Sequence, residues 1–293
     1  MTRYYTRVCN FYYGNKSKTL VKEKKTKPLN GNDRISFDNV EIITRNSKRV
    51  IPLKNINLLS PNLKKKIKKD IKIVSKKCIF KNLTFNSIPN IMGVLNVTPD
   101  SFSDGGKYFK NNLAKKHLNY LFRCGANLVD IGGESTRPGS KSINSDVEWN
   151  RIKKVLKNID NKKFISLDTR KSEVMEKGIK YGIKLINDVS GLNYDRSSIA
   201  ILKRYRIPFV LQHSLGNPDV MQNNPKYKNV LLDIYDFFEK KISYLRKQGI
   251  QHNNIILDPG IGFGKNLKHN ITILNQLSIF HSLGFPIMLG ISK

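Results

Sequence analysis

The feature that most constrains the fold is the regular alternation of short apolar runs and amphipathic segments from residue 91 onward. Short apolar runs bounded by Gly, Pro or polar residues are typical of buried parallel strands, and the segments between them have helical periodicity. We expect strands at 91–96, 127–132, 164–168, 184–188, 208–213, 254–258 and 286–291. We expect helices at 110–124, 146–159, 172–181, 196–205, 228–248 and 268–282. The alternation predicts successive βα units.

Polar residues or glycine stand at the carboxyl ends of the expected strands. They are Asn96, Asp130, Asp168, Asn187, Asp188, His213, Asp258 and Gly290. Polar groups that share one end of many parallel strands indicate a (β/α)8 TIM-type barrel, in which each strand contributes to one common site. An open doubly wound sheet is the alternative. It would carry a G-x-G-x-x-G turn after its first strand, and the residues after Leu95 do not match that motif.

The composition excludes several other classes of protein. A formal net charge of +31 in 293 residues suggests nucleic acid, but the lysines are spread along the whole chain and no recognition module is visible. We therefore expect a solvated, lysine-rich surface, and nucleic acid is an unlikely partner. Cys9, Cys78 and Cys124 are odd in number and widely spaced, which excludes a disulfide scaffold and a four-thiolate zinc site.

The sequence also predicts where the protein resides. Its N-terminus has no apolar secretory region, and no segment has the roughly 18 consecutive apolar residues of a membrane span. We expect a cytoplasmic protein that does not associate with membranes.

Residues 1–78 differ in character from the rest and have no assignable role. A strand is expected within 32–44 and a short basic amphipathic helix at 63–74. We expect a partly ordered N-terminal extension, with the remnant of a fused domain as the alternative. Residues 79–293 then form the barrel domain.

Six motifs in the same order closely resemble those of dihydropteroate synthase. They are IMGVLNVTPDSFSDGG (91–106), DIGGESTRPG (130–139), ISLDT (165–169), INDVSG (186–191), HSLGNPDVMQ (213–222) and DPGIGFGK (258–265). The resemblance covers about residues 80–293. It implies a pterin-binding (β/α)8 barrel that condenses a dihydropterin-methyl diphosphate with 4-aminobenzoate, which yields dihydropteroate and diphosphate for folate synthesis.

The resemblance also implies the substrate-binding residues. Asp168, Asn187 and Asp258 match the family's pterin contacts, and a carboxylate suits the adjacent N–H donors of the pterin edge. Thr136 matches a substrate-contacting threonine, Arg137 a mobile cation near the diphosphate, and Phe263 the phenylalanine beside the aminobenzoate ring. No acid–base pair is implied, and His213 is expected to be a hydrogen-bonded structural residue.

A metal cofactor follows from the same resemblance. A diphosphate leaving group needs its negative charge neutralised, and Mg²⁺ with oxygen ligands can do this. Asn96 matches the family's metal-associated asparagine. Waters and substrate oxygens would complete the coordination shell.

The sequence departs from the family at its C-terminus. Members typically continue with Ser-Arg-Lys, a helix, an eighth strand that bears Arg-x-His, and a last helix, whereas this sequence stops at Lys293. We expect an incomplete barrel, completed by a separately encoded C-terminal fragment if the gene is split. Lys293 matches either the family's substrate-contacting lysine or the arginine that precedes it. A homodimer is a further expectation.

Two alternative functions remain open. One is that of another pterin-barrel protein, such as a methyltetrahydrofolate-dependent methyltransferase. The other is that of a truncated, non-catalytic remnant that acts only as a basic binding protein.

Overall fold

The computed structural model describes residues 2–78, 80, 89–98, 111–135, 142–157, 159–160, 163–214 and 225–290. Its internal contacts divide the chain into two compact units. Unit 1 comprises Met1–Ile79, Lys226–Lys241 and Leu267–Ile287, and unit 2 comprises Phe80–Pro225, Ile242–Asn266 and Met288–Lys293.

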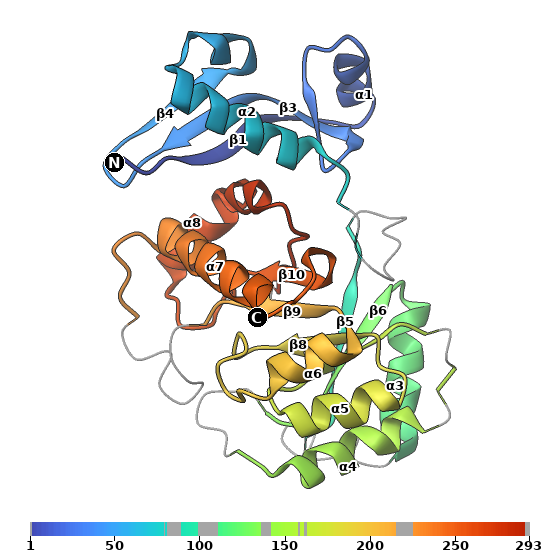
Figure 1. The fold of residues 1–293 in the computed structure, drawn as a ribbon. Coiled ribbons are helices and arrows are strands. Elements are labelled where there is room, and N and C mark those ends of the chain that lie inside the picture. Colours follow the sequence, from blue (N-terminus) through green and yellow to red (C-terminus); the bar gives the residue numbers. More distant parts are fainter. Residues whose placement is uncertain are drawn as a thin grey trace. The chain divides into compact units, whose positions relative to one another are not determined.

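Unit 2 is built on a six-stranded parallel sheet (Figure 1). Its strands are β5 (Met92–Asn96), β6 (Leu128–Gly132), β7 (Ile165–Asp168), β8 (Leu185–Asp188), β9 (Phe209–Gln212) and β10 (Ile255–Asp258). Each strand pairs with the next one along the chain. A doubly wound sheet reverses its strand order at a switch point, whereas a barrel adds its strands in turn. The observed order therefore supports the barrel and excludes the doubly wound alternative.

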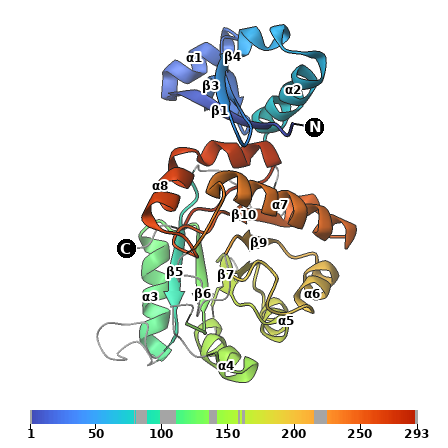
Figure 2. The same cartoon turned by 90° about the vertical axis from the view of Figure 1, so that its left-hand side faces the viewer.

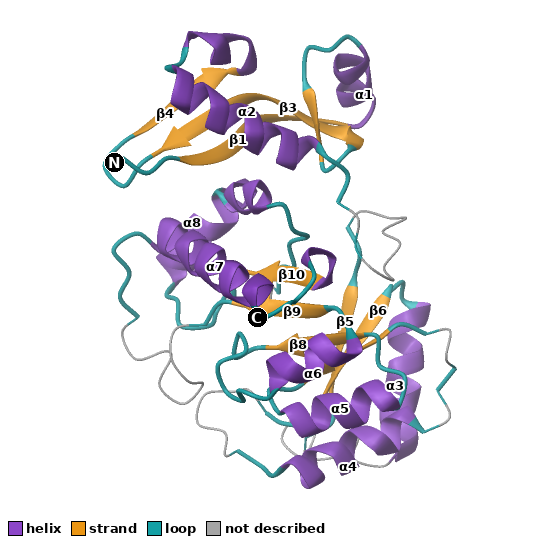
Figure 3. Cartoon of the chain, viewed as in Figure 1, coloured by secondary structure: helices purple, strands orange, loops and turns teal. Residues whose placement is uncertain are grey.

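Four helices connect the first five strands of this sheet. They are α3 (Asn111–Arg123), α4 (Ser145–Leu156), α5 (Ser172–Lys180) and α6 (Ser198–Tyr205). Neighbouring helices pack on each other in chain order, and Figures 2 and 3 show them outside the strands, as in the outer layer of a barrel. α4 begins with a capped turn, because the Asn144 side chain accepts a hydrogen bond from the Val147 N–H at 2.8 Å.

A compact apolar cluster lies among the strands of unit 2. Leu128, Leu185, Val210 and Ile256 come from four different strands, and Phe80 joins them. All of these side chains are buried. Interior layers that take residues from several strands are characteristic of a filled barrel.

Two of the elements expected near the C-terminus differ in the structure. The prediction of a seventh strand at 286–291 was wrong for the described part of that range. Ile287 makes only an isolated bridge, and the Met288 N–H donates to the Leu257 carbonyl at 2.8 Å. One such contact beside β10 does not extend into a ladder. The single helix expected at 268–282 is α8 (Leu267–Asn275) followed by the 3-10 helix η4 (Leu277–Leu283). Gln276, at φ −124°, interrupts the helical backbone between them.

Unit 1 contains a four-stranded antiparallel sheet with β3 (Asn32–Ile43) at its centre. β1 (Tyr5–Tyr13) pairs along one side of β3, and β2 (Lys27–Leu29) and β4 (Lys48–Pro52) pair along the other. α1 (Gly14–Lys22), η1 (Leu53–Leu58) and α2 (Pro61–Ser75) complete this part of the unit.

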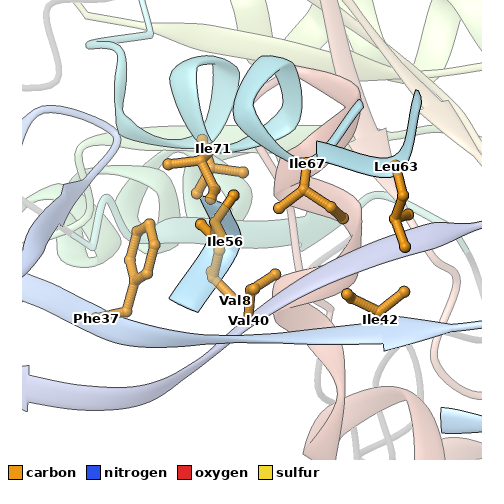
Figure 4. Close-up of a cluster of buried hydrophobic side chains, with 9 residues drawn as sticks. Val8, Phe37, Val40, Ile42, Ile56, Leu63, Ile67 and Ile71 are labelled. Carbon is orange, nitrogen blue, oxygen red and sulfur yellow. The ribbon is translucent and has the colours of Figure 1, made fainter. Parts of the chain in front are cut away.

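The N-terminal sheet has a hydrophobic core of its own. Figure 4 shows Leu63, Ile67 and Ile71 of α2 pointing toward Val8 and Val40 of the sheet. These apolar positions recur at helical spacing, so one stripe of α2 is buried while its lysines face outward. The expected strand and basic helix are confirmed, but the expectation of a partly ordered extension was wrong.

Later parts of the chain complete unit 1. The Tyr5 hydroxyl donates to Asp236 Oδ1 at 2.9 Å, and Asp236 belongs to α7 (Val230–Lys247). The Ser278 hydroxyl of η4 donates to the Val8 carbonyl at 2.8 Å. The N-terminal sheet therefore packs on α7 and η4, whose contacting residues lie 231 and 270 positions later in the sequence. Within the described ranges, no helix is long and apolar enough to cross a membrane.

Candidate functional site

The carboxyl ends of β5, β6 and β7 bring two of the expected site residues together. In the sheet register, Asn96 lies opposite Gly132, and Gly132 lies opposite Asp168. A Cβ placed on Gly132 would lie 3.0 Å from Asn96 Oδ1 and 3.3 Å from Asp168 Oδ2. Because Gly132 has no side chain, the two oxygens converge over its backbone.

The neighbouring strands add a buried amide and a buried carboxylate. Asn187, opposite Asp168 in the register, donates from Nδ2 to Asp130 Oδ2 at 2.7 Å. Both side chains are buried. Asn187 Oδ1 is also buried and has no hydrogen-bond partner among the described residues. Buried polar atoms in native proteins are nearly always satisfied, so this oxygen is suited to accept a hydrogen bond from a ligand.

The carboxylates at these strand ends have raised pKa values. Burial raises the pKa of Asp168 well above its ordinary value, and the nearby carboxylates, Asp130 first among them, raise it further. Burial also raises the pKa of Asp130, although hydrogen bonds from Ser166 and Asn187 oppose this. Clustered acids with raised pKa values are typical of functional sites, because a ligand with donor groups relieves their desolvation and repulsion.

Asp258 stands at the carboxyl end of β10 and begins a glycine-rich turn. It is buried, and its Oδ1 accepts a hydrogen bond from the Gly260 N–H at 2.7 Å. Burial raises its pKa to about 6, while that hydrogen bond and the Lys265 charge act to lower it. The carboxylate is therefore ionised at neutral pH. Phe263 lies five residues on, partly exposed, and its N–H donates to the Gly260 carbonyl at 3.1 Å.

Lys265 joins this turn to the end of β9. Its buried ammonium donates to the Phe263 carbonyl at 2.8 Å and to the His213 carbonyl at 3.2 Å, and it lies 3.1 Å from His213 Nδ1. Burial lowers the pKa of Lys265 to about 7, against the opposing effect of Asp258. His213 is thus hydrogen-bonded, as expected, and its structural role stays a prediction.

The structure brings Asn96, Asp168, Asn187 and Asp258 to one end of the sheet, with Phe263 in the turn after it. Thr136, Arg137 and Lys293 lie outside the described residues, so their assignments remain predictions. The site as described presents hydrogen-bond acceptors at several strand ends. This arrangement suits a flat heterocycle with adjacent N–H groups.

Comparison with known proteins decides the family. The model of the pterin-binding enzymes matches residues 92–293. This range includes all six strands and the site at their ends.

The chain belongs to the pterin-binding enzyme family.

Individual members of the family extend the comparison. The chain is 40% identical to the dihydropteroate synthase of Escherichia coli strain K12 over 209 residues, which cover 71% of this chain and 74% of the relative. It is 37% identical to that of Bacillus subtilis strain 168 over 215 residues, 72% of each chain.

Solved structures of pterin-binding enzymes share the fold. The Yersinia pestis dihydropteroate synthase in complex with a sulfonamide drug matches with a TM-score of 0.69 and 38% identity, over 73% of this chain and 78% of that one. The Xanthomonas albilineans enzyme with 4-aminobenzoic acid matches with a TM-score of 0.65 and 36% identity, over 72% and 75%. The TIM-type barrel predicted from the sequence is therefore confirmed as the fold.

Three further polar residues at these strand ends were given no individual role by the sequence analysis. Asp130 holds Asn187, Lys265 holds the turn after β10, and Glu134 lies in a buried ion cluster after β6. Each stands within a motif that the sequence had singled out. The sequence signal that could have indicated these roles was a charged residue in or next to a buried strand, because a buried charge requires partners.

Proposed function

We propose that the strand ends of unit 2 form a pterin pocket at which the chain condenses (7,8-dihydropterin-6-yl)methyl diphosphate with 4-aminobenzoate. The products of this reaction are 7,8-dihydropteroate, an intermediate of folate biosynthesis, and diphosphate. The observation that carries the proposal is the buried, unpartnered Asn187 Oδ1 beside the acidic strand ends. Family membership and the Xanthomonas albilineans structures with 4-aminobenzoic acid and with 7,8-dihydropteroate support it.

Recognition of the pterin would use acceptors of different character. Asp258, ionised at neutral pH, accepts from the adjacent donors of the aminopyrimidine edge, and Asn187 Oδ1 accepts a further N–H. Asp168, with its raised pKa, either accepts as a carboxylate or donates as a neutral acid. Binding the heterocycle here satisfies atoms that are otherwise buried at a cost.

Asn96 is the protein ligand proposed for Mg²⁺. Asn96 is an exposed residue, and its Oδ1 and Asp168 Oδ2 would both lie close to a Cβ placed on Gly132, at 3.0 Å and 3.3 Å. Oxygen donors of this kind suit a hard cation. The described residues hold no cluster of three or more His, Cys, Asp or Glu side chains around a metal position. Mg²⁺ commonly keeps several waters and takes substrate phosphate oxygens, which would complete its coordination shell beside Asn96. The ion would neutralise charge on the diphosphate.

The amine substrate is assigned to the segments after β6 and β10. Phe263 would lie beside the aminobenzoate ring, Thr136 would contact this substrate, and Arg137 and Lys293 would offset negative charge. These four roles rest on the match between this sequence and the family motifs.

The reaction proposed is a substitution at the pterin methylene carbon. The C–O bond breaks with both electrons going to the diphosphate oxygen, and the resulting cation is stabilised by the pterin ring. The neutral amine then forms the C–N bond and loses one proton to solvent or diphosphate. Protein groups orient two flat reactants and stabilise the departing charge, so no acid–base pair is required.

Diphosphate release by the purified chain tests this function. We expect release only when the pterin diphosphate, 4-aminobenzoate and Mg²⁺ are all present, and formation of dihydropteroate in equal amount. Asn187→Ala should lower kcat/KM about 10-fold to 100-fold, because the pterin loses an acceptor in Asn187 Oδ1 and Asp130 loses its hydrogen bond from Asn187 Nδ2. Pterin binding without product formation would contradict a synthase, and methyl transfer from methyltetrahydrofolate to a corrinoid would favour the methyltransferase alternative.

The remaining parts of the proposal concern the setting of the enzyme. A cytoplasmic location suits the three cysteines, none of which forms a disulfide in the structure. We also propose a homodimer in solution. Sedimentation velocity of the purified chain tests this, and a monomer at micromolar concentration would contradict it.

A further inference from the structure

A buried cluster of ion pairs lies behind the strand ends of unit 2. The Lys171 ammonium is 2.8 Å from Glu134 Oε1 and 2.5 Å from Glu148 Oε2. Arg170 Nε lies 3.0 Å from Glu134 Oε2, and its guanidinium stacks over the Tyr194 ring at 4.1 Å. Glu134, Glu148 and Lys171 are buried. The cluster therefore joins Glu134, which follows β6, to Arg170 and Lys171, which follow Asp168 at the end of β7.

Glu134 also makes contacts that the other acid of the cluster lacks. Its Oε1 accepts a hydrogen bond from the Ile143 N–H at 3.0 Å and from the Ser142 hydroxyl at 3.2 Å. Glu134 precedes residues 136–141, and Ser142 and Ile143 follow them. One carboxylate therefore ties together the two flanks of the segment that bears Thr136 and Arg137.

Backbone contacts fix the same region to α4. Arg151 Nη1 donates to the Gly133 carbonyl at 2.9 Å. A Cβ on Gly133 would lie 2.8 Å from the Glu148 carbonyl, so the chain passes close to the helix at this point. These contacts hold the backbone before Glu134 in place. The Glu134 side chain then holds Ser142 and Ile143, which follow residues 136–141.

The pKa of Glu134 is consistent with a permanent charge. Burial alone would raise it, but hydrogen bonds from Lys171, the Ile143 N–H and Arg170 bring it below its ordinary value. Burial raises the pKa of Glu148, although Lys171 opposes this. The contacts of Glu134 therefore favour its ionised form.

We propose that Glu134 is a positioning residue for the amine substrate, which it serves by fixing the two flanks of residues 136–141 to the cluster beside β7. This inference rests on the proposed function, in which Thr136 contacts the amine substrate. A purely stabilising role would not require the contacts to Ser142 and Ile143. Glu148 supplies a comparison, since it is fully buried and shares Lys171 but makes no described contact to either flank.

The test compares Glu134→Gln with the matched control Glu148→Gln. Both changes neutralise one buried acid of the cluster, and only the first weakens the hold on Ser142 and Ile143. We expect Glu134→Gln to raise the KM for 4-aminobenzoate about 10-fold, as expected for lost hydrogen bonds to a charged group, with the pterin diphosphate KM within about 2-fold. Glu148→Gln should leave the ratio of the two KM values unchanged.

Hydrogen exchange gives a readout that does not depend on turnover. The Ile143 amide should exchange at least about 10-fold faster in Glu134→Gln than in the wild type and be little changed in Glu148→Gln, because only Glu134 accepts its hydrogen bond. Ser142→Ala removes one of the same contacts without touching a buried ion pair. It should raise the amine KM about 3-fold, which keeps the test decisive if Glu134→Gln does not fold.

The outcomes separate the two proposals. A wild-type chain without synthase activity contradicts the proposed function. An active wild type in which Glu134→Gln and Ser142→Ala leave both the amine KM and the Ile143 exchange rate unchanged overturns only the role of Glu134. A proportional rise in both KM values in Glu134→Gln and Glu148→Gln alike indicates a stabilising cluster and overturns it as well.

Discussion

At the scale of single residues, the site combines carboxylates whose pKa values are raised in different surroundings. The pKa of Asp258 is about 6, whereas that of Asp168 is raised well above its ordinary value next to Asp130. Asp258 has the Gly260 N–H and the Lys265 charge on its side, whereas Asp168 faces other acids. Acids in different environments can take different roles toward one ligand.

Pterin affinity should rise with pH through the ionisation of Asp258. Folding raises the pKa of Asp258 from 3.8 to about 6, so the ligand-free folded protein favours the protonated carboxyl. The contribution of this group to the free energy of unfolding is fully present below about 3.8 and is lost as pH rises through 6. Ligand binding has the opposite dependence, because the carboxylate is the acceptor. We expect the affinity for 6-hydroxymethylpterin, measured by calorimetry, to fall up to about 10-fold per pH unit below 6 and to level off above 7.

Asp258→Asn is the control for this pH dependence. The amide does not ionise, so the dependence near pH 6 should disappear, and affinity at pH 7.5 should fall about 30-fold to 100-fold with the loss of charge-assisted hydrogen bonds. A wild-type affinity that stays flat between pH 5 and 7 would contradict the role of Asp258.

At the scale of the element, the turn after β10 depends on glycine. Gly260 and Gly262 have φ values of +68° and +83°, in the left-handed region that L side chains rarely adopt. Only Gly260 is also crowded, because a Cβ there would lie 2.1 Å from the His213 carbonyl oxygen, whereas a Cβ on Gly262 meets nothing within 4 Å. The first glycine is needed for space and conformation, and the second for conformation alone.

Gly260→Ala and Gly262→Ala form a matched pair that separates these effects. Gly262→Ala should cost about 1–2 kcal/mol of unfolding free energy from the left-handed backbone alone. Gly260→Ala should cost about 2–5 kcal/mol, because overpacking adds to that strain, and it should also weaken pterin binding by displacing Asp258. Urea denaturation and calorimetry measure both. Equal losses in the two variants would show that the close approach to His213 does not matter.

The sequence predicted the first six barrel strands to within one or two residues, because each is a short, mainly apolar run that ends in a polar residue or glycine. It was wrong at 286–291 and at 268–282, where local pattern does not decide the outcome. Strand formation at Ile287 depends on the extent of pairing beside β10, and the break at Gln276 depends on a backbone angle. Site residues at strand ends were recognisable for the same reason as the strands, whereas the partners of Glu134 lie 8 to 37 positions away and form no local pattern.

At the scale of the whole molecule, unit 1 is assembled from three separate stretches of chain. The strand and helix of its N-terminal part were visible as local patterns. Their packing on α7 and η4 was not, because Tyr5 and Asp236, or Val8 and Ser278, are more than 200 residues apart. Burial against these helices adds to the N-terminal part's own hydrophobic core, and together they favour a folded segment over a loose extension.

Ile67→Ala tests whether unit 1 is a cooperative unit that includes these later segments. Ile67 is fully buried between α2 and the sheet, so truncation should cost about 2–5 kcal/mol, whereas the control Leu58→Ala, at an 83% exposed side chain, should stay within about 0.5 kcal/mol. α2 also packs on η4. In native-state hydrogen exchange, the loss of protection in Ile67→Ala should therefore extend over β1, β3 and η4, while β6 to β9 keep theirs. An equal loss in β6 to β9 would mean that the two units open as one, and a loss confined to residues 2–78 would mean that η4 does not belong to the cooperative unit.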